Sequence, residues 1–422
     1  MDDSAPDAQR AAREAAYAVP LEELNPGAPE LFRSDSLWPY FERLREEAPV
    51  HWAVSPQTDI GGYWSVTRYN DIVAVDTDHE TFSSEPAIVL PDPEPDFTLP
   101  MFIAMDPPRH DQQRKTVTPI VSGPNLAHLA PIIRERAGAI LDELPIGEEF
   151  DWVDKVSIEL TTMTLATLFD FPWEDRRKLT RWSDVATAPP DSHLFEPGRG
   201  KEQRKEELFE CVGYFAQLWN ERVDAPPRPD LISMLAHGES TRNMDRMEYL
   251  GNLLLLIVGG NDTTRNTISA SVHALSQNPD QERRLRADPE LIPAMVSETV
   301  RWQTPLAYMR RVAKRDVELG GRTIRAGDKV AMWYISGNRD ERVIERPNDY
   351  WIERPRVRQH LAFGFGIHRC VGMRLAELQL QIIWEEILKR FPAIEVTGRP
   401  TKVYSSFVHG YERLPVVIPQ RA

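Results

Sequence analysis

The sequence of 422 residues is poor in cysteine and in basic side chains. Its two cysteines, Cys211 and Cys370, are too few for a disulfide framework, a four-cysteine zinc site or an iron–sulfur cluster held by four thiolates. Lysine and arginine number 50 against 65 aspartates and glutamates, which gives a formal charge of −15. Because a nucleic-acid binder needs a basic face to neutralise phosphates, this charge argues against nucleic-acid binding.

Long apolar runs are also missing. A membrane span needs about 20 consecutive apolar residues, whereas the strongest run extends only from Leu253 to Val258. The first two dozen residues lack the basic start and apolar middle of a secretory signal, so we expect a cytoplasmic protein without a transmembrane segment. The hydrophobic content of 41% is ample for a buried core. Without repeats or a long polar linker, the chain is predicted to form one domain over residues 1–422, with a flexible segment at residues 1–20.

Apolar residues at helical spacing dominate the chain and predict a mainly α protein with small β-sheets. The predicted helices are Leu126–Leu144, Val156–Phe169, Lys201–Val223, Arg246–Ser276, Leu291–Trp302 and Arg374–Phe391. The predicted strands, which lie among glycine and proline turns, are His51–Val54, Tyr63–Val66, Val317–Leu319, Lys329–Trp333 and Val416–Ile418.

Two proline-rich stretches interrupt this pattern. Pro86 to Pro108 carries seven prolines in 23 residues, so it can form neither a helix interior nor a central strand. Ala188 to Gly200 similarly separates two amphipathic helices. Long loops of this kind are either plain surface connections or lids over binding sites, and we favour the lid interpretation for both.

Cys370 lies where a glycine-containing loop enters the last long helix. A helix N-terminus stabilises a thiolate and lowers the pKa of a cysteine there, so Cys370 is a candidate nucleophile or metal ligand. Gly364 and Gly366 permit a tight turn and leave room for a large planar cofactor near the backbone. Taken alone, however, a cysteine is more often a small core residue, which is the interpretation we give to Cys211.

The whole loop carries more information than its cysteine. The pattern Phe363-Gly364-x-Gly366-x-His368-x-Cys370 closely resembles the haem-binding loop of the cytochrome P-450 monooxygenases. The resemblance implies a P-450 fold, with haem b lying between the cysteine loop and a long central helix. It further implies that Cys370 is the axial ligand of the haem iron, that His368 pairs with a haem propionate and that Phe363 shields the sulfur. A thiolate ligand donates electron density that favours O–O cleavage.

A second motif lies in the longest predicted helix, which we expect to begin near Asp245 and to end before Asn278. Its interior contains Gly259-Gly260-Asn261-Asp262-Thr263, although each interior glycine costs about 1 kcal/mol relative to alanine. Close packing of another helix is one explanation. The segment also resembles the family's oxygen-binding kink, which implies a locally opened helix at Gly259, with Thr263 hydrogen-bonding oxygen at the iron and Asp262 linking a proton relay to solvent.

Further resemblances concern fold residues and haem carboxylates. Glu298 and Arg301 lie three apart on one helix face and resemble the family's buried Glu-x-x-Arg pair, with Arg354 as its third member. His110 and Arg114 resemble residues under the haem edge, and Arg311 resembles a strand arginine that reaches a propionate. Arg310 is an alternative to Arg311, and each basic residue alone could be a surface charge.

The resemblance covers nearly the whole chain and implies a monooxygenase that inserts one atom of O2 into a C–H bond. The chain has no room for a reductase domain, so electrons from NAD(P)H are expected through a separate ferredoxin and ferredoxin reductase. Because the net charge would repel an acidic ferredoxin, we hypothesise that some arginines near the cysteine loop form a docking face. The candidates are Arg354, Arg356, Arg358, Arg369 and Arg374.

The segments Met105–Lys115 and Glu298–Ala307 resemble the bacterial branch that hydroxylates the terminal methyl of medium-chain alkanes and fatty acids. Such a pocket must hold the chain end at the iron. The candidate wall residues, which are also plausible core residues, are Val89, Leu90, Phe102, Ile103, Leu256, Leu306 and Phe407. The alternatives are a hydroxylase of another hydrophobic substrate such as a terpenoid, a peroxide-using member, a haem sensor without catalysis, and a cysteine hydrolase that uses Cys370.

Overall fold

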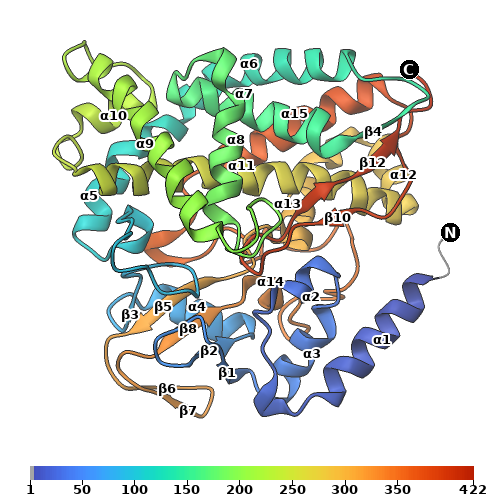
Figure 1. Cartoon of the computed structure of the whole chain (residues 1–422). Helices are drawn as coiled ribbons and strands as arrows, with labels where there is room; N and C mark the ends of the chain where they lie inside the picture. Colours follow the sequence, from blue (N-terminus) through green and yellow to red (C-terminus); the bar gives the residue numbers. More distant parts are fainter. Residues whose placement is uncertain (1–3) are drawn as a thin grey trace.

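A computed structural model describes residues 4–422. Figure 1 shows a larger helical part above a smaller part that contains the main sheet and helices α1 to α4. The α-helices are α1 (Ser4–Ala18), α2 (Pro29–Arg33), α3 (Trp38–Glu47), α4 (Tyr69–Thr77), α5 (Arg109–Val117), α6 (Gly123–Asp142), α7 (Glu159–Phe169), α8 (Arg177–Thr187), α9 (Gly200–Val223), α10 (Leu231–His237), α11 (Arg246–Gln277), α12 (Pro279–Ala287), α13 (Ile292–Gln303), α14 (Tyr334–Gly337) and α15 (Met373–Arg390).

Four small sheets accompany the helices, so the predicted mainly α fold is confirmed. The largest sheet has the strand order β1-β2-β8-β5-β3, and all its pairings are antiparallel except that between β2 and β8. The strands are β1 (Val50–Val54), β2 (Gly62–Val66), β3 (Phe82–Ser83), β4 (Glu149–Asp151), β5 (Met309–Ala313), β6 (Val317–Leu319), β7 (Arg322–Ile324), β8 (Lys329–Met332), β9 (Glu395–Val396), β10 (Thr401–Lys402), β11 (Tyr411–Arg413) and β12 (Pro415–Val417).

Helix α11 is the long central helix of the upper part. Asp245 caps its start, where the carboxylate accepts the backbone N–H groups of Met247 and Glu248 at 2.8 and 2.9 Å. At 1.5 Å per residue its 32 residues span about 48 Å. It packs against α7, α8, α13 and α15 and buries side chains on most of its circumference, which explains its apolar sequence.

The N-terminal region differs from the expectation. The sequence predicts a flexible segment over residues 1–20, of which residues 1–3 lie outside the described residues. The structure instead has helix α1, which packs against α3. Ala16 of α1 is fully buried, and the carbonyl oxygen of Ala16 accepts a hydrogen bond from Arg43 at 2.8 Å. Alanines are spread through α1, and Ala16 is the one buried residue among residues 9–18. The sequence therefore shows no apolar stripe that would indicate packing.

The described part of the chain contains no helix that is both long enough and apolar enough to cross a lipid bilayer.

Candidate active site

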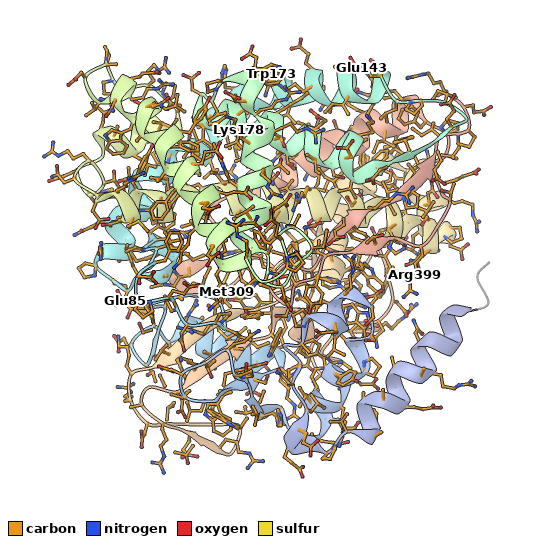
Figure 2. All side chains as sticks on the ribbon, viewed as in Figure 1. Glu85, Glu143, Trp173, Lys178, Met309 and Arg399 are labelled. Carbon is orange, nitrogen blue, oxygen red and sulfur yellow. The ribbon has the colours of Figure 1, made fainter. Side chains whose placement is uncertain are left out.

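A cavity of about 780 Å³ lies between α9, α11, the proline-rich loop that precedes α5 and the loop that carries Cys370. Figure 2 places Met309 of β5, one of its lining residues, at the level where the helical part meets the main sheet. Both proline-rich loops contribute to the wall, the first through much of its length and the second through Ala188, Pro189 and Pro190. A volume of this size is in the range of small-molecule and cofactor sites.

Six of the seven predicted wall residues line this cavity: Val89, Phe102, Ile103, Leu256, Leu306 and Phe407. The prediction for Leu90 is wrong. Its side chain is buried in a core cluster with Phe32 and Trp333, and its backbone N–H donates to the Tyr308 hydroxyl at 3.0 Å. Val89 and Pro91 line the cavity on either side of it, as expected where successive residues of an extended segment point to opposite faces.

The loop before α15 brings Phe363, His368 and Cys370 to the cavity wall. The Cys370 N–H donates to the carbonyl oxygen of Phe363 at 2.8 Å, which closes the loop. Gly364 and Gly366 have φ angles of 67° and 63°, a conformation that favours glycine. A Cβ at Gly366 would lie 2.5 Å from the carbonyl oxygen of Asp76 in α4, so the partner that approaches this glycine closely is a helix of the protein itself.

The thiol of Cys370 lies deep in the protein, yet its side chain is exposed to the cavity. Burial raises its pKa above the ordinary value, although the N–H groups of Gly372 and Met373 at the start of α15 and the charge of Arg114 act in the opposite direction. The expectation of a lowered pKa is therefore wrong for the protein alone, because desolvation outweighs the helix terminus. Coordination to a metal cation deprotonates a thiol outright.

Two histidines meet beside the cysteine loop. The ring centroids of His110 and His368 lie 4.2 Å apart. His368 Nε2 bonds to the Ser84 hydroxyl at 2.8 Å and His110 Nδ1 bonds to Asp111 at 2.7 Å. Within the described part of the chain, His110 Nε2 and His368 Nδ1 are buried without a hydrogen-bond partner. Burial lowers the pKa of both rings, that of His368 to about 2, so neutral imidazoles are available for a ligand.

The predicted arginines occupy different positions. Arg114 and Arg311 line the cavity together with His368, whereas His110 lies behind His368. Arg114 donates to the carbonyl oxygen of Arg369 at 2.5 Å, and Arg311 pairs with Asp76 at 2.8 Å.

Arg310 is fully buried outside the cavity lining and bonds to Asp92 at 3.0 Å. The structure therefore brings Arg311, and not Arg310, to the cavity.

The glycine motif of α11 faces the same cavity. Gly259, Gly260 and Thr263 line it, and a Cβ at Gly259 would meet nothing within 4 Å. The helix is continuous here, and the Thr263 hydroxyl donates to the carbonyl oxygen of Gly259 at 2.8 Å. The local opening that the resemblance implies is thus present as free space beside Gly259 rather than as a break in the helix.

Asp262 does not line the cavity. It is fully buried against α8, where it accepts a hydrogen bond from Ser183 at 2.9 Å and pairs with Arg265 at 3.0 Å. Arg265 in turn pairs with Asp184 at 2.5 Å. Burial raises the pKa of Asp262 and Arg265 lowers it less. Asp262 has no exposed surface of its own, and it connects to the partly exposed Asp184 through Arg265. The proton relay expected from the sequence stays a prediction.

We predict different effects on stability for alanine at the two glycines of α11. Gly259→Ala gains helix propensity, up to about 1 kcal/mol of stability, and its methyl enters open space. Gly260→Ala gains no net stability, because its Cβ would lie 2.7 Å from Leu165 Cδ2 and the leucine must shift. Thermal unfolding of both variants tests this, and a less stable Gly259→Ala would contradict the cavity position of that residue.

A buried charged cluster holds the segment before the cysteine loop. Glu298 and Arg301 are both 0% exposed and their side chains pair at 2.8 Å, while Arg354 approaches Glu298 at 3.0 Å. The arginines also donate to carbonyl oxygens of Pro347 and Asp349. The predicted triad is confirmed, and Arg354 is therefore a fold residue rather than part of a docking face.

The site does not fit a cysteine hydrolase. A nucleophilic cysteine needs a base within hydrogen-bond reach, whereas no histidine in the described residues hydrogen-bonds Cys370, and His368 Nε2 is engaged by Ser84. The geometry instead brings the sulfur of Cys370, the unpartnered Nδ1 of His368 and the side chains of Arg114 and Arg311 to one cavity.

Comparison with known proteins decides the family. The sequence model of the family described as cytochrome P450 matches residues 65–408. The chain belongs to the cytochrome P450 family. It is a cytochrome P450 monooxygenase, and family membership implies a haem held through the thiolate of its cysteine loop.

Three similar proteins extend over most of this P450. Linalool 8-monooxygenase of Pseudomonas putida is 37% identical over 402 residues, which cover 92% of this chain and 97% of that protein. The methyl-branched lipid omega-hydroxylase of Mycobacterium tuberculosis H37Rv is 30% identical over 390 residues, 89% of this chain and 90% of that protein. The solved structure of CYP153D17 from Sphingomonas sp. PAMC 26605 is 49% identical, with a TM-score of 0.86 and coverage of 94% and 98%.

The residues around the cavity fit a haem. Cys370 would hold the iron through its sulfur, and His368 Nδ1, which is buried without a partner, offers a donor for a propionate oxygen, which cannot be buried without partners. His110 Nδ1 donates to the Asp111 carboxylate, so Nε2 of the neutral His110 ring is an acceptor and not a donor. Arg114 and Arg311 would add positive charge there. Once bound, the haem supplies the redox chemistry that activates O2.

Sequence reasoning missed Asp76, which positions this site from α4. Its carboxylate pairs with Arg311 and accepts bonds from the Phe365 N–H and the Tyr334 hydroxyl, each at 2.8 Å. No sequence signal marks it, because its partners lie more than 230 positions away.

Proposed function

We propose that this P450 hydroxylates the terminal methyl group of medium-chain alkanes, fatty acids or related aliphatic compounds. The observation that carries the proposal is the set of apolar side chains, including Val89, Phe102 and Leu256, that lines the same cavity as Cys370. A terminal methyl is the least reactive carbon of such a chain. The cavity walls must therefore hold this methyl at the haem iron and keep the inner methylenes away from the iron. The similarity to a methyl-branched lipid omega-hydroxylase supports this.

A terpenoid hydroxylase is the second candidate, favoured by the similarity to linalool 8-monooxygenase. Product analysis separates the two. The holoenzyme, supplied with NADPH and a bacterial ferredoxin and reductase, is given dodecane, dodecanoic acid and linalool separately. We expect the terminal alcohol as the main product of at least one straight-chain compound. Oxidation of linalool alone, or mainly in-chain alcohols, would contradict the first proposal.

Thr263 is proposed to hold a proton donor over the bound haem. In Thr263→Ala, we expect product formed per O2 consumed to fall at least about tenfold, because positioned proton transfer typically contributes 10²-fold or more. Oxygen uptake and product are measured together. Ser271→Ala, whose hydroxyl accepts the Trp384 indole N–H at 2.8 Å on the same helix, is the control. Full coupling in Thr263→Ala would refute the role.

Electron delivery by a separate ferredoxin is likewise a proposal. Of the five arginines near the cysteine loop, four are exposed: Arg356, Arg358, Arg369 and Arg374. Of these, Arg358 pairs with Glu377 at 2.7 Å. We expect Arg374→Glu to slow reduction by an acidic ferredoxin about tenfold at low salt and to weaken the salt dependence. Arg283→Glu, 73% exposed on α12, is the control. Equal rates in stopped-flow experiments would exclude Arg374 from the docking face.

A further inference from the structure

One cation in the wall of the cavity has neither an ionic nor a hydrogen-bonding partner among the described residues. The charged side chains that line the cavity include Asp92, Glu94, Lys205 and Arg311. Asp92 pairs with Arg310, Glu94 with Lys205 at 2.7 Å, and Arg311 with Asp76. Arg204 also lines the cavity, yet within the described chain its guanidinium makes neither an ion pair nor a hydrogen bond.

Arg204 occupies the second turn of α9. Leu208, four residues later and therefore on the same helix face, also lines the cavity and is 1% exposed. The Arg204 side chain therefore lies on the helix face that lines the cavity, and Arg204 is half-buried. Burial lowers the pKa of Arg204, which the charge of Glu94 only partly offsets, so the cation is left with a desolvation cost that a ligand could remove.

Glu94 does not supply the missing partner. Its carboxylate is held by Lys205 at 2.7 Å and lies 4.0 Å from Lys201, and Lys205 also pairs with Asp96 at 2.9 Å. These lysines neutralise the acidic residues of the neighbouring loop. An anion that enters the cavity therefore meets a free guanidinium, whose planar fork matches the two oxygens of a carboxylate.

We propose that Arg204 anchors the carboxylate of a chain-length acid, so that the preferred substrate is an ionised fatty acid rather than a neutral alkane or terpenoid. This inference rests on the proposed terminal hydroxylation and deepens it. Arg204 and Cys370 line the same cavity, so a chain held at its carboxylate leaves its methyl end as the part free to reach the haem. Fixing one end of a flexible chain restricts which carbon is presented.

Paired ligands of equal length test the anchor. Dodecanoate and dodecan-1-ol are titrated into the holoenzyme at pH 7.5 while the spin-state shift of the Soret band is followed. In Arg204→Gln we expect the Kd of dodecanoate to rise about 10- to 100-fold, as for loss of a charged hydrogen bond, and the Kd of dodecan-1-ol to change less than about twofold. In Arg204→Lys, which keeps the positive charge, the Kd of dodecanoate should rise less than in Arg204→Gln. Arg199→Gln, an exposed arginine before α9 that pairs with Glu196, should match the wild type.

Two results in an Arg204→Gln variant with a normal carbon-monoxide spectrum would overturn the anchor proposal. One is an equal rise in the Kd of dodecanoate and of dodecan-1-ol, and the other is an unchanged Kd for dodecanoate. That spectrum also reports whether each variant has folded and bound haem, and Arg204→Lys provides a second folded variant. The outcomes for the two proposals are distinct. If dodecane is hydroxylated at its terminal carbon and ligand binding does not depend on Arg204, only the anchor proposal is refuted. If dodecanoate binding depends on Arg204 but the products are in-chain alcohols, only the proposal of terminal hydroxylation is refuted.

Discussion

Cys370→Ser is expected to abolish hydroxylation, with activity at least about 10³-fold below the wild type. Serine fills nearly the same space in the loop closed by the Cys370 N–H bond to Phe363, so the fold should survive. It removes the thiolate, whose electron donation to iron drives O–O cleavage. A 10³-fold loss corresponds to about 4 kcal/mol of transition-state stabilisation. Product formation under saturating NADPH and redox partners is the measurement.

The second cysteine provides a matched control for this prediction. Cys211 is fully buried among apolar side chains of the main core, and burial raises its pKa, so it acts as a small hydrophobic residue. Cys211→Ala should keep the spectrum and most of the activity. A Cys370→Ser enzyme with more than a tenth of wild-type turnover would exclude Cys370 as the ligand.

Glu298→Gln should lower the free energy of unfolding by about 3–5 kcal/mol, the range for breaking a buried charged group of this kind. Glutamine leaves the charges of Arg301 and Arg354, which are 0% and 3% exposed, without a counter-charge. Several carbonyl oxygens still accept from the arginines, but none is anionic. Thermal unfolding monitored by circular dichroism gives the change. Glu385→Gln, whose partner Arg134 is 41% exposed, should shift stability by less than about 1 kcal/mol.

The same triad predicts a pH dependence. The two arginines lower the pKa of Glu298 below its ordinary value of 4.5, although burial acts against them. A carboxylate with a lowered pKa in the folded state stabilises the protein above its unfolded pKa, and this contribution is lost as the pH falls through the folded value. Wild-type stability should therefore decline below pH 4.5 more steeply than that of Glu298→Gln. Parallel acid-unfolding curves would contradict this assignment.

Apolar periodicity predicted most of the architecture. The six predicted helices were found with ends shifted by a few residues, including α11 and its Asp245 cap, because long amphipathic patterns and caps are local properties. The first turn of the predicted helix at Val156–Phe169 belongs instead to a π-helical segment, Val153–Ile158. Such a change of hydrogen-bond register has no simple signature in the pattern of apolar residues.

The sequence predicts the site residues that belong to a motif, but it does not predict which way a side chain points when packing between helices determines it. The motif residues Cys370, Phe363, Gly259 and Thr263 all face the cavity. Asp262 adjoins Thr263 in sequence, yet one residue of rotation on α11 turns it toward Ser183 and Thr187 of α8, whose hydroxyls donate to its carboxylate.

Asp76 and Arg204 could not have been found from the sequence alone. Asp76 positions the site through partners that are distant in the chain. Arg204 matters because no described residue forms an ion pair or hydrogen bond with its guanidinium.

The central claim is that Cys370 holds a haem iron as a thiolate in this cavity. The most direct test is the difference spectrum of the reduced, purified holoenzyme before and after addition of carbon monoxide. We predict a strongly red-shifted Soret band, as expected for a thiolate opposite carbon monoxide, and its loss in Cys370→Ser. A band at the position of ordinary histidine-ligated haem, or no haem band in the purified protein, would contradict the claim.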